Sequence, residues 1–306
     1  MVASLVPQFL NPPVNAATDI RVIIVNYNAA ETIIACIQSV LVAGETANIT
    51  LYDNASSDGS MQQIRDACSS HEKLEIIQGT ENIGFSRAIN AAAQSRDEKY
   101  LLFLNPDCEL LPGSLEYLEE ALEEDADAAM AGPLVMDRQG AVQKGTLRRF
   151  PDPRRSFLSV TGLWRLGRKF PSFKGVEHHH SELPESTTAA EAVSGACMLV
   201  RREPFMDCGG MDEEYGLHCE DLDLMYRFGQ LGFHCLFVPA ARVIHQQGVS
   251  SRSRPLWVHR QKHLGMQRFF NKFQAGQYPF PLRWLVITGI WLRYTLTLPG
   301  VLIRHR

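Results

Sequence analysis

Four short apolar runs alternate with helix-like segments over the first 125 residues. The runs span residues 21–27, 49–54, 74–77 and 101–104, and each is bounded by polar residues, glycine or proline. Apolar runs of this length that end at breakers predict buried strands rather than helices. Between the first two runs, the apolar residues from Ile33 to Leu41 recur at helical spacing. This alternation predicts an α/β fold in which a mainly parallel sheet is flanked by helices.

Polar residues stand where each predicted strand ends. The carboxyl ends of parallel strands meet at one edge of the sheet, which is where open α/β sheets bind ligands. We therefore expect these side chains to gather on one rim. In chain order they are Asn26, Tyr27, Asn28, Asp53, Asn54, Asn82, Asn105 and Asp107, and the turn at Asn82 adds Gly84 and Phe85.

Asp107 is the first candidate for chemistry on that rim. It follows Pro106, which prevents further strand pairing. A carboxylate there suits a divalent cation shared with a diphosphate, because Mg²⁺ takes one or two carboxylates plus phosphate oxygens. The alternative is that Asp107 caps the turn before a helix that begins near Ser114. The glycine motifs of dinucleotide folds and of P-loops are both missing from the sequence.

The pattern is less regular in the second half of the chain. Residues 128–136 predict another strand, whereas residues 145–188 predict a long insertion or a flexible loop near the site. Three adjacent histidines at 178–180 are expected in a solvated loop rather than on a metal. Residues 191–201 predict a further strand, in which Gly195 would let a ligand or another backbone approach closely.

Two acids stand at the start of a predicted helix. Apolar residues at i, i+3 and i+6 from Leu222 place that start near Glu220. The helix dipole favours Glu220 and Asp221 in the first turn, so simple electrostatic placement is one reading of them. An ionised acid held there is also a ready general base. Further on, a predicted strand over 233–238 leads to His245, which precedes a glycine loop where it could bind a ligand.

The composition sets the class of protein. The chain has 306 residues, of which 45% are hydrophobic and 21% charged, as in ordinary globular proteins. Seven cysteines, an odd number without any C-x-x-C pair, argue for reduced thiols in the cytosol. The first 19 residues read as a loose leader, and the first 18 lack the features of a signal peptide.

The net charge of −4 hides an asymmetry between the body and the tail. Residues 246–306 contain ten Lys and Arg and no acid, so this segment carries +10 and leaves −14 on the rest. A basic tail on an acidic body suggests an anionic partner, either nucleic acid or a membrane. The aliphatic content of the tail favours lipid over nucleic acid.

Two helix candidates make up this tail. Residues 257–273 interleave basic and apolar side chains, and residues 284–303 are strongly apolar apart from Arg293 and Pro299. An arginine at mid-bilayer costs about 2.5–3.5 kcal/mol on insertion scales. We therefore expect peripheral contact through 257–303, with aromatic residues at headgroup depth, rather than a clean span. The alternative is a helix packed on the catalytic domain.

Taken together, the motifs resemble the family-2 glycosyltransferases, which have the GT-A fold, and most of all their rhamnosyltransferase subgroup from bacterial surface polysaccharide assembly. The resemblance implies a GT-A domain over 20–250, with a nucleotide-binding half (20–125) and an acceptor and catalytic half (126–250), followed by C-terminal helices over 251–306. The matching motifs, in family order, are Val25-Asn-Tyr-Asn28, Asp53-Asn-Ala-Ser-Ser-Asp-Gly59, Asn82-Ile-Gly-Phe-Ser86, Leu104-Asn-Pro-Asp107, Ser194-Gly-Ala-Cys197, Gly209-Gly-Met-Asp-Glu213, Cys219-Glu-Asp-Leu-Asp-Leu224 and Pro239 to His245.

The resemblance assigns roles to these positions. Asp107 would coordinate Mg²⁺ or Mn²⁺ on the donor diphosphate, with His245 as a further ligand. Asn105 stands where the family's D-x-D has its first Asp, which leaves the metal one anionic ligand fewer. Asp221 would be the general base on the acceptor hydroxyl, with Glu220 beside it. The residues expected to bind the nucleotide sugar are Asn26, Tyr27, Asn28, Asp53, Asn54, Asn82, Gly84, Phe85, Asn105, Asp107 and Gly195.

The implied reaction is an inverting sugar transfer, because one base serves the acceptor and no second carboxylate acts as a nucleophile. The expected donor is dTDP-L-rhamnose, and the expected acceptor is a glycan or a polyprenyl-diphosphate-linked sugar at the cytoplasmic face of the membrane. Three alternatives stay open: a UDP-sugar donor, a nucleotidyltransferase that makes sugar nucleotides, and a non-catalytic nucleotide-sugar-binding or scaffold subunit. The nucleotidyltransferase would require a glycine-rich, basic loop after the first strand, and residues 26–30 do not provide one.

Overall fold

The computed structural model describes residues 19–43, 47–68, 71–95, 97–168, 170–173, 175–176, 183–246 and 254–304. Residues 1–18 of the expected leader and the three histidines at 178–180 lie outside this described part. The main sheet contains β1 (Ile20–Asn26), β2 (Asn48–Asp53), β3 (Leu74–Gln78), β4 (Tyr100–Leu104), β5 (Cys108–Leu110), β6 (Ala128–Met136), β8 (Thr188–Ala190), β10 (Cys197–Arg201) and β11 (His234–His245).

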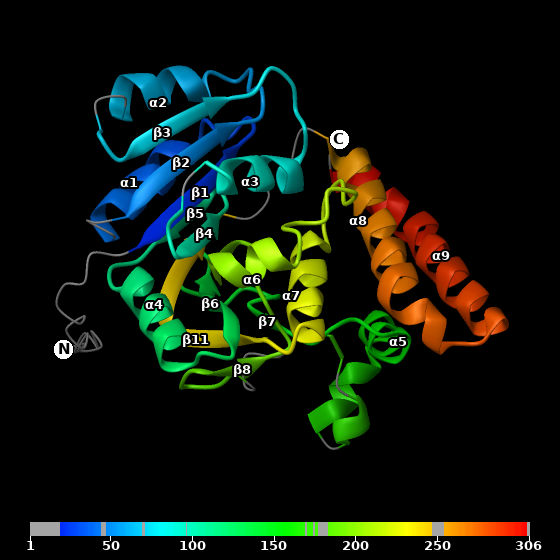
Figure 1. Cartoon of the computed structure of the whole chain (residues 1–306). Coiled ribbons are helices and arrows are strands. Elements are labelled where there is room, and N and C mark those ends of the chain that lie inside the picture. Colours follow the sequence, from blue (N-terminus) through cyan, green and yellow to red (C-terminus); the bar gives the residue numbers. More distant parts are fainter. Residues whose placement is uncertain are drawn as a thin grey trace, which may run out of the picture.

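The sheet runs in the order β3-β2-β1-β4-β10-β6-β11-β5, and β8 also pairs with β11 (Figure 1). The first four of these strands are parallel, as the alternation of strands and helices predicts. Their register aligns Asn26 with Asp53, so the polar strand ends do meet on one rim. The expected mixed α/β sheet is confirmed.

Both faces of the sheet are buried, which explains why its central strands are apolar throughout. In β1, Val22 and Ile24 pack into one core, while Ile23 and Val25 pack into the other. Helices α1, α2 and α4 cover the first face, and α3, α6 and α7 cover the second. The helices are α1 (Ile33–Ala43), α2 (Ser60–Cys68), α3 (Phe85–Ala93), α4 (Ser114–Glu124), α5 (Pro153–Thr161), α6 (Arg202–Asp207), α7 (Glu220–Gln230), α8 (Pro255–Phe269) and α9 (Phe280–Arg304).

The second half of the sheet departs from the expected strands. The strand expected over 191–201 is two strands, because the chain leaves the main sheet at residues 194–196. The first part, β9 (Ala192–Val193), pairs with β7 (Leu147–Arg148) in a separate small sheet, and β10 then runs antiparallel between β4 and β6. The short strand β5 is not among the expected strands. It forms because the turn after Asn105 returns the chain to pair with the end of β11.

The segment over 145–188 is not a loop throughout, and that part of the expectation is wrong. It contains α5 and the 3₁₀ helices η1 (Leu163–Arg168) and η2 (Pro171–Phe173). Local residues account for α5: the carboxylate of Asp152 accepts a hydrogen bond from the backbone N–H of Arg155 at 2.7 Å, and Pro153 stands at the first helical position. Gly162 then ends the helix in the left-handed conformation (φ 76°).

The tail is held to the domain through α8. Arg268 and Lys272 both pair with Asp212, at 2.8 and 2.6 Å, and Lys272 also reaches the buried Asp223 at 2.6 Å. Part of the basic tail therefore neutralises the acidic body. The last residue of α8, Phe269, is buried in the second core. A π-helical turn (Phe270–Gln274) and a 3₁₀ turn (Ala275–Gln277) lead into α9.

Helix α9 returns alongside α8 and stands off the sheet (Figure 1). The indole N–H of Trp291 donates to Gln267 at 2.7 Å, and the ring of Tyr294 stacks on His259 with centroids 4.8 Å apart. Residues 280–303 form one helix long and apolar enough to cross a membrane, and none of its most apolar window is buried. The C-terminal apolar helix is thus present, and it packs on α8 rather than in the two cores of the described domain.

Candidate active site

A cavity of about 2310 Å³ opens along the carboxyl ends of the central strands. One wall is made by strand ends and by the start of α7, and the outer walls by α5 and by the α8–α9 pair. Residues from every expected part of the site line it. They are Tyr27, Asn54, Asn82, Gly84, Phe85, Asn105, Asp107, Gly195, Glu220, Asp221 and His245.

Three of the expected nucleotide-binding residues lie behind this wall. Asn26 and Asp53 are fully buried, and the Asn26 amide nitrogen donates to Asp53 Oδ1 at 3.0 Å and to Ser60 at 2.9 Å. Asn28 adopts φ 53° and accepts a hydrogen bond from the backbone N–H of Ser57 at 2.8 Å. Among the described residues, Asn26, Asn28 and Asp53 shape the rim and are not in the cavity lining.

Asn54 connects this rim to the next turn. Its side-chain oxygen accepts the backbone N–H of Ile83 at 3.0 Å, and its amide nitrogen donates to the carbonyl of Gly84 at 3.2 Å. Asn82 accepts the backbone N–H of Gly84 at 2.9 Å. Gly84 has φ 89°, a conformation that glycine adopts without strain. These contacts hold the turn at 82–84 against β2 and leave a polar floor in the cavity.

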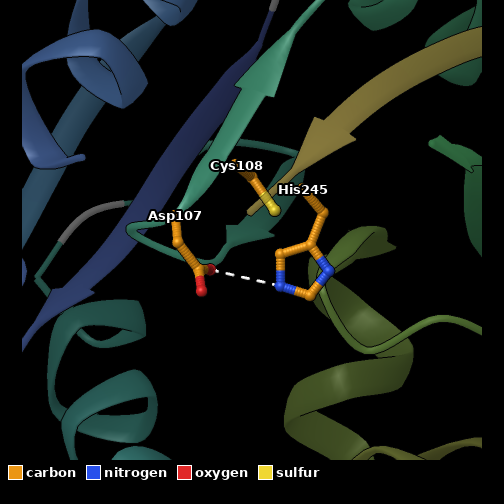
Figure 2. Close-up of side chains that lie close together, drawn as sticks. All are labelled: Asp107, Cys108 and His245. Atoms are coloured by element: carbon orange, nitrogen blue, oxygen red, sulfur yellow. Dashed lines mark ion pairs between the residues drawn. The ribbon is translucent and has the colours of Figure 1, made fainter. Parts of the chain in front are cut away.

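Asp107 and His245 form the second part of the site. The β5–β11 pairing places His245 opposite Cys108, so the imidazole faces the carboxylate of the neighbouring Asp107. Figure 2 shows the two side chains pointing at each other, with His245 Nε2 3.2 Å from Asp107 Oδ1. Both are largely buried. The other ring nitrogen, Nδ1, lies 3.0 Å from Gln143 Oε1.

This donor set fits a divalent cation. A proton on Nδ1, held by Gln143, leaves the Nε2 lone pair free to bind a metal, and such a partner commonly orients a ligating histidine. Cys108 is near enough to complete a group of three possible ligands. However, burial and the charge of Asp107 hold the pKa of the Cys108 thiol well above its usual value. Asp107 and His245 line the cavity, whereas the Cys108 thiol is outside its lining and donates to the carbonyl of Ala196 at 3.5 Å.

Asp221 and Arg148 form the third part of the site. Arg148 Nη2 donates to Asp221 Oδ2 at 2.5 Å and to the carbonyl of Val193 at 2.5 Å. Asp221 Oδ1 also accepts the backbone N–H of Leu222 at 2.8 Å. Burial acts to raise the pKa of Asp221, but the charge and hydrogen bond of Arg148 outweigh it and hold that pKa below its usual value. Asp221 is therefore ionised at neutral pH.

Glu220 has the opposite character. Burial first, and then the neighbouring charge of Asp221, raise the pKa of the Glu220 carboxyl. Its Oε2 atom is buried and has no hydrogen-bond partner. Two adjacent carboxyl groups with opposite shifts are typical of sites where one acid is ionised and the other is kept neutral.

The backbone around these acids is tightly packed. A Cβ on Gly195 would lie 2.6 Å from Asp221 Oδ2, so only glycine fits at that position. His218 and Cys219 both have positive φ, 67° and 71°, just before α7. Non-glycine residues in this region cost about 1–3 kcal/mol each and cluster at functional sites. This strained turn aims the first residues of α7 at the cavity.

Sequence reasoning missed Arg148 and Gln143. Both lie in or next to the irregular segment after β6, where no periodicity indicates which side chains face the site. Each acts on a residue far along the chain, Asp221 or His245. A lone Arg and a lone Gln in a polar stretch carry no signal of their own, so neither could have been singled out.

Comparison with known proteins agrees with this geometry. The model of glycosyl transferase family 2 matches residues 21–209, more than half of the chain. The N-acetylglucosaminyl-diphospho-decaprenol L-rhamnosyltransferase of Mycobacterium tuberculosis is 28% identical over 85% of this chain and 86% of its own length. Rhamnosyltransferase WbbL of Escherichia coli is 26% identical over 76% of this chain and 86% of its own length.

Solved structures support the fold. A mannosyltransferase from Pyrobaculum calidifontis, in complex with GDP-Man and Mn²⁺, has a TM-score of 0.57 at 15% identity and covers 97% of this chain and 76% of its own. GalNAc-T7, with UDP, GalNAc and Mn²⁺, has a TM-score of 0.55 at 19% identity and covers 74% of this chain and 43% of its own. The expected GT-A fold is confirmed by these neighbours.

Proposed function

This chain belongs to glycosyl transferase family 2, and on that premise we propose that it transfers L-rhamnose, with inversion, to a polyprenyl-diphosphate-linked sugar in bacterial surface polysaccharide assembly. The observation that carries the proposal is one cavity lined both by Asp107 and His245 at the strand ends and by Asp221 at the start of α7. Asp107 and His245 could hold a metal ion on the donor diphosphate, and Asp221 could accept the proton of the acceptor hydroxyl. The two rhamnosyltransferase relatives, matched over most of their length, support the choice of sugar.

The rim after β1–β4 is the proposed nucleotide site. Tyr27, Asn54 and Asn82 offer hydrogen-bonding side chains around the cavity floor, and Phe85 offers an apolar face. Asn26, Asn28 and Asp53 act behind them by fixing the turns. None of these contacts distinguishes thymine from uracil. The choice of dTDP-L-rhamnose as donor therefore rests on the similarity to rhamnosyltransferases, and a UDP-sugar is the alternative donor.

Asp107 and His245 are the proposed ligands of Mg²⁺ or Mn²⁺. When bound, the ion supplies positive charge that stabilises the diphosphate as it leaves. Gln143 would fix the ring of His245 by its contact at Nδ1. An imidazole ligand suits Mn²⁺ better than Mg²⁺, because Mg²⁺ prefers oxygen ligands.

Asp221 is the proposed general base. The acceptor oxygen attacks the anomeric carbon, the bond from that carbon to the diphosphate breaks, and the hydroxyl proton moves to Asp221. Attack from the face opposite the diphosphate inverts the anomeric configuration. Arg148 keeps the Asp221 carboxylate ionised and oriented until the acceptor hydroxyl arrives.

A lipid-linked acceptor suits the C-terminal helices. Helix α9 exposes apolar residues such as Trp284 and Ile303, and other residues of the same helix line the cavity. We propose that α8 and α9 make peripheral contact with the cytoplasmic face of the membrane, where interfacial tryptophans and basic residues are favoured.

Calorimetry of the purified protein against a panel of nucleotide sugars, with Mg²⁺, Mn²⁺ or EDTA, tests the donor half of this proposal. Binding of dTDP-L-rhamnose that weakens with EDTA is the expected result. Binding of a UDP-sugar instead would keep the fold and change the donor. Binding that ignores EDTA would remove Asp107 and His245 as metal ligands. A folded protein that binds no donor would favour a scaffold subunit.

A further inference from the structure

The segment of α5 and η1 carries a second apolar surface, to which the proposed transfer step assigns no role. Phe157 and Val160 on α5 are each 60% exposed, and Phe170, just after η1, is 55% exposed. Leu163 and Leu166 on η1 are also exposed. We call these five residues the α5–η1 surface. Single exposed apolar residues are ordinary, whereas apolar residues exposed together are a feature of interaction sites, and these five lie within 14 residues of one another.

The sequence of this segment is basic, while Asp152 and Glu191 stand at its base, where both pair with Arg155. Residues 153–176 contain six Lys and Arg and no acid, in a chain whose net charge is −4. Arg155 pairs with Glu191 at 2.6 Å, so it contributes little outward charge. Arg165 lies over the ring of Trp164, 5.2 Å from its centroid. Apolar side chains among basic ones complement an anionic lipid surface.

The α5–η1 surface and α9 border the same cavity. Phe157, Val160 and Trp164 line it on the α5–η1 segment, and Leu285 and Leu296 line it on α9. Figure 1 shows α5 and the α8–α9 pair on the same side of the molecule, both outside the sheet. The cavity is therefore bordered by apolar side chains from both segments.

The tryptophans of the chain lie only in the α5–η1 segment and in the α8–α9 pair. All four lie in these two regions, at positions 164, 257, 284 and 291. Tryptophan is enriched where a protein meets the membrane–water interface, because its ring is apolar and its N–H is polar. No such residue occurs in the rest of the sequence, which includes the whole sheet.

The segment is fixed to the catalytic domain at its base. Phe150 packs on Tyr226 of α7 with centroids 5.1 Å apart. Gln274, which follows α8, donates to the carbonyl of Pro151 at 2.5 Å. The backbone N–H of Phe150 also donates to Glu191 at 2.9 Å. These contacts hold α5 in one position relative to the cavity and to the tail.

We propose that the α5–η1 surface docks on an anionic bilayer and inserts its apolar side chains at headgroup depth. Together with α9 it would straddle the mouth of the cavity, so that the cavity opens onto the membrane. This purpose rests on the proposed lipid-linked acceptor, but the docking itself does not require transfer activity. The occupant is a bilayer because charge, apolar exposure and aromatic placement coincide on one side of the molecule.

Vesicle flotation with the full chain tests this. The variant Phe157→Ser/Val160→Ser/Phe170→Ser is compared with Val42→Ser/Met206→Ser/Leu231→Ser, which removes three exposed apolar residues from other faces. The vesicles contain either phosphatidylcholine alone or phosphatidylcholine with phosphatidylglycerol. We expect the first variant to bind the anionic vesicles on the order of tenfold more weakly, since each inserted side chain adds apolar burial. The control variant should bind as the wild type does.

Equal binding by both variants would overturn the proposal. If the first variant also lost a dimer seen by light scattering while vesicle binding stayed unchanged, the surface would belong to a second copy of the chain. Circular dichroism and calorimetric binding of the donor nucleotide confirm that each variant is folded. Because donor binding and flotation are separate readouts, failure of the proposed function is distinguishable from failure of this docking.

Fluorescence provides a second readout that does not depend on weakening the surface. In the variant Trp257→Phe/Trp284→Phe/Trp291→Phe, Trp164 is the remaining tryptophan. Anionic vesicles that contain bromine-labelled phosphatidylcholine should quench its emission, because bromine quenches tryptophan only at short range. Emission that is unchanged on vesicles which float this variant would place the α5–η1 surface away from the bilayer and refute the proposal.

Discussion

Replacing Asp221 by Asn should abolish sugar transfer while leaving donor binding nearly unchanged. The substitution keeps the shape of the side chain and removes its charge. Asp221 lines the cavity beside Gly195, whereas the proposed donor contacts lie on the β1–β4 rim and at Asp107. The change therefore acts on the proton acceptor and not on the nucleotide site.

The magnitude follows from the role of the group. A positioned general base contributes about 10²–10⁴-fold in rate, which corresponds to about 2.7–5.4 kcal/mol of activation free energy. The substitution also removes the charge of Asp221 from its ion pair with Arg148. That loss should lower the free energy of unfolding by about 2–3 kcal/mol, since both side chains are largely but not fully buried. Removal of the Asp221 charge also lowers the pKa of Glu220, which offsets part of this loss.

The assay is single-turnover transfer, measured beside donor calorimetry and a thermal melt. Asp212→Asn is the matched control, because Asp212 is an ion-paired carboxylate of the same region that does not line the described cavity. The control should lose stability and keep its turnover. If Asp221→Asn turned over like the wild type while Glu220→Gln were inactive, the base would be Glu220 and the reasoning from the Arg148 contact would be refuted.

Four further outcomes follow from the same geometry. Glu220→Gln should raise the melting temperature above neutral pH. The raised pKa of Glu220 in the folded protein stabilises the fold at low pH, and this stabilisation is lost as pH rises through that pKa. Thermal melts at several pH values check this. Burial acts to raise the pKa of Asp212, but its ion pairs and hydrogen bonds outweigh burial and lower that pKa to about 2. The Asp212 carboxylate therefore stabilises the fold above the pKa that Asp has in the unfolded chain, and this stabilisation is lost as pH falls through its pKa in the folded protein. In the same melts, Asp212→Asn should lower the melting temperature at pH 7 but not near pH 2. His245→Ala should weaken donor binding in the presence of Mn²⁺ by about 10–100-fold. In EDTA the same substitution should weaken donor binding less, and calorimetry under both conditions checks this. Gly195→Ala should reduce turnover by about 10²-fold, since its methyl group would displace the Asp221 carboxylate, while donor affinity measured in parallel stays within a few-fold.

The parallel half of the fold could be read from the sequence because each strand is short, apolar and closed by a breaker. The meeting of Asn26 with Asp53 follows from that alternation alone. The approach of Asp107 and His245 could be anticipated only through the resemblance to a family. It depends on β5, a three-residue strand that carries no periodic signal of its own.

The rest of the site depends on long-range contacts that no local pattern encodes. Arg148 reaches Asp221, and Gln143 reaches His245, from a segment whose prolines and basic residues suggest only a loop. The sequence shows that the tail is basic, but it does not show which acidic residues these basic side chains pair with. Arg268 and Lys272 turn inward to Asp212 and Asp223, because α8 docks on the acidic loop before α7.

Analysis of the reaction product tests whether this chain transfers L-rhamnose with inversion. The purified protein is incubated with dTDP-L-rhamnose, Mn²⁺ and a short-chain polyprenyl-diphosphate N-acetylglucosamine, and the lipid product is examined by mass spectrometry and NMR. We expect one added deoxyhexose with its anomeric configuration inverted relative to the donor, and an initial rate at least about 10²-fold lower with Asp221→Asn. A product with retained configuration, or no product from a folded protein that binds the donor, would contradict this expectation.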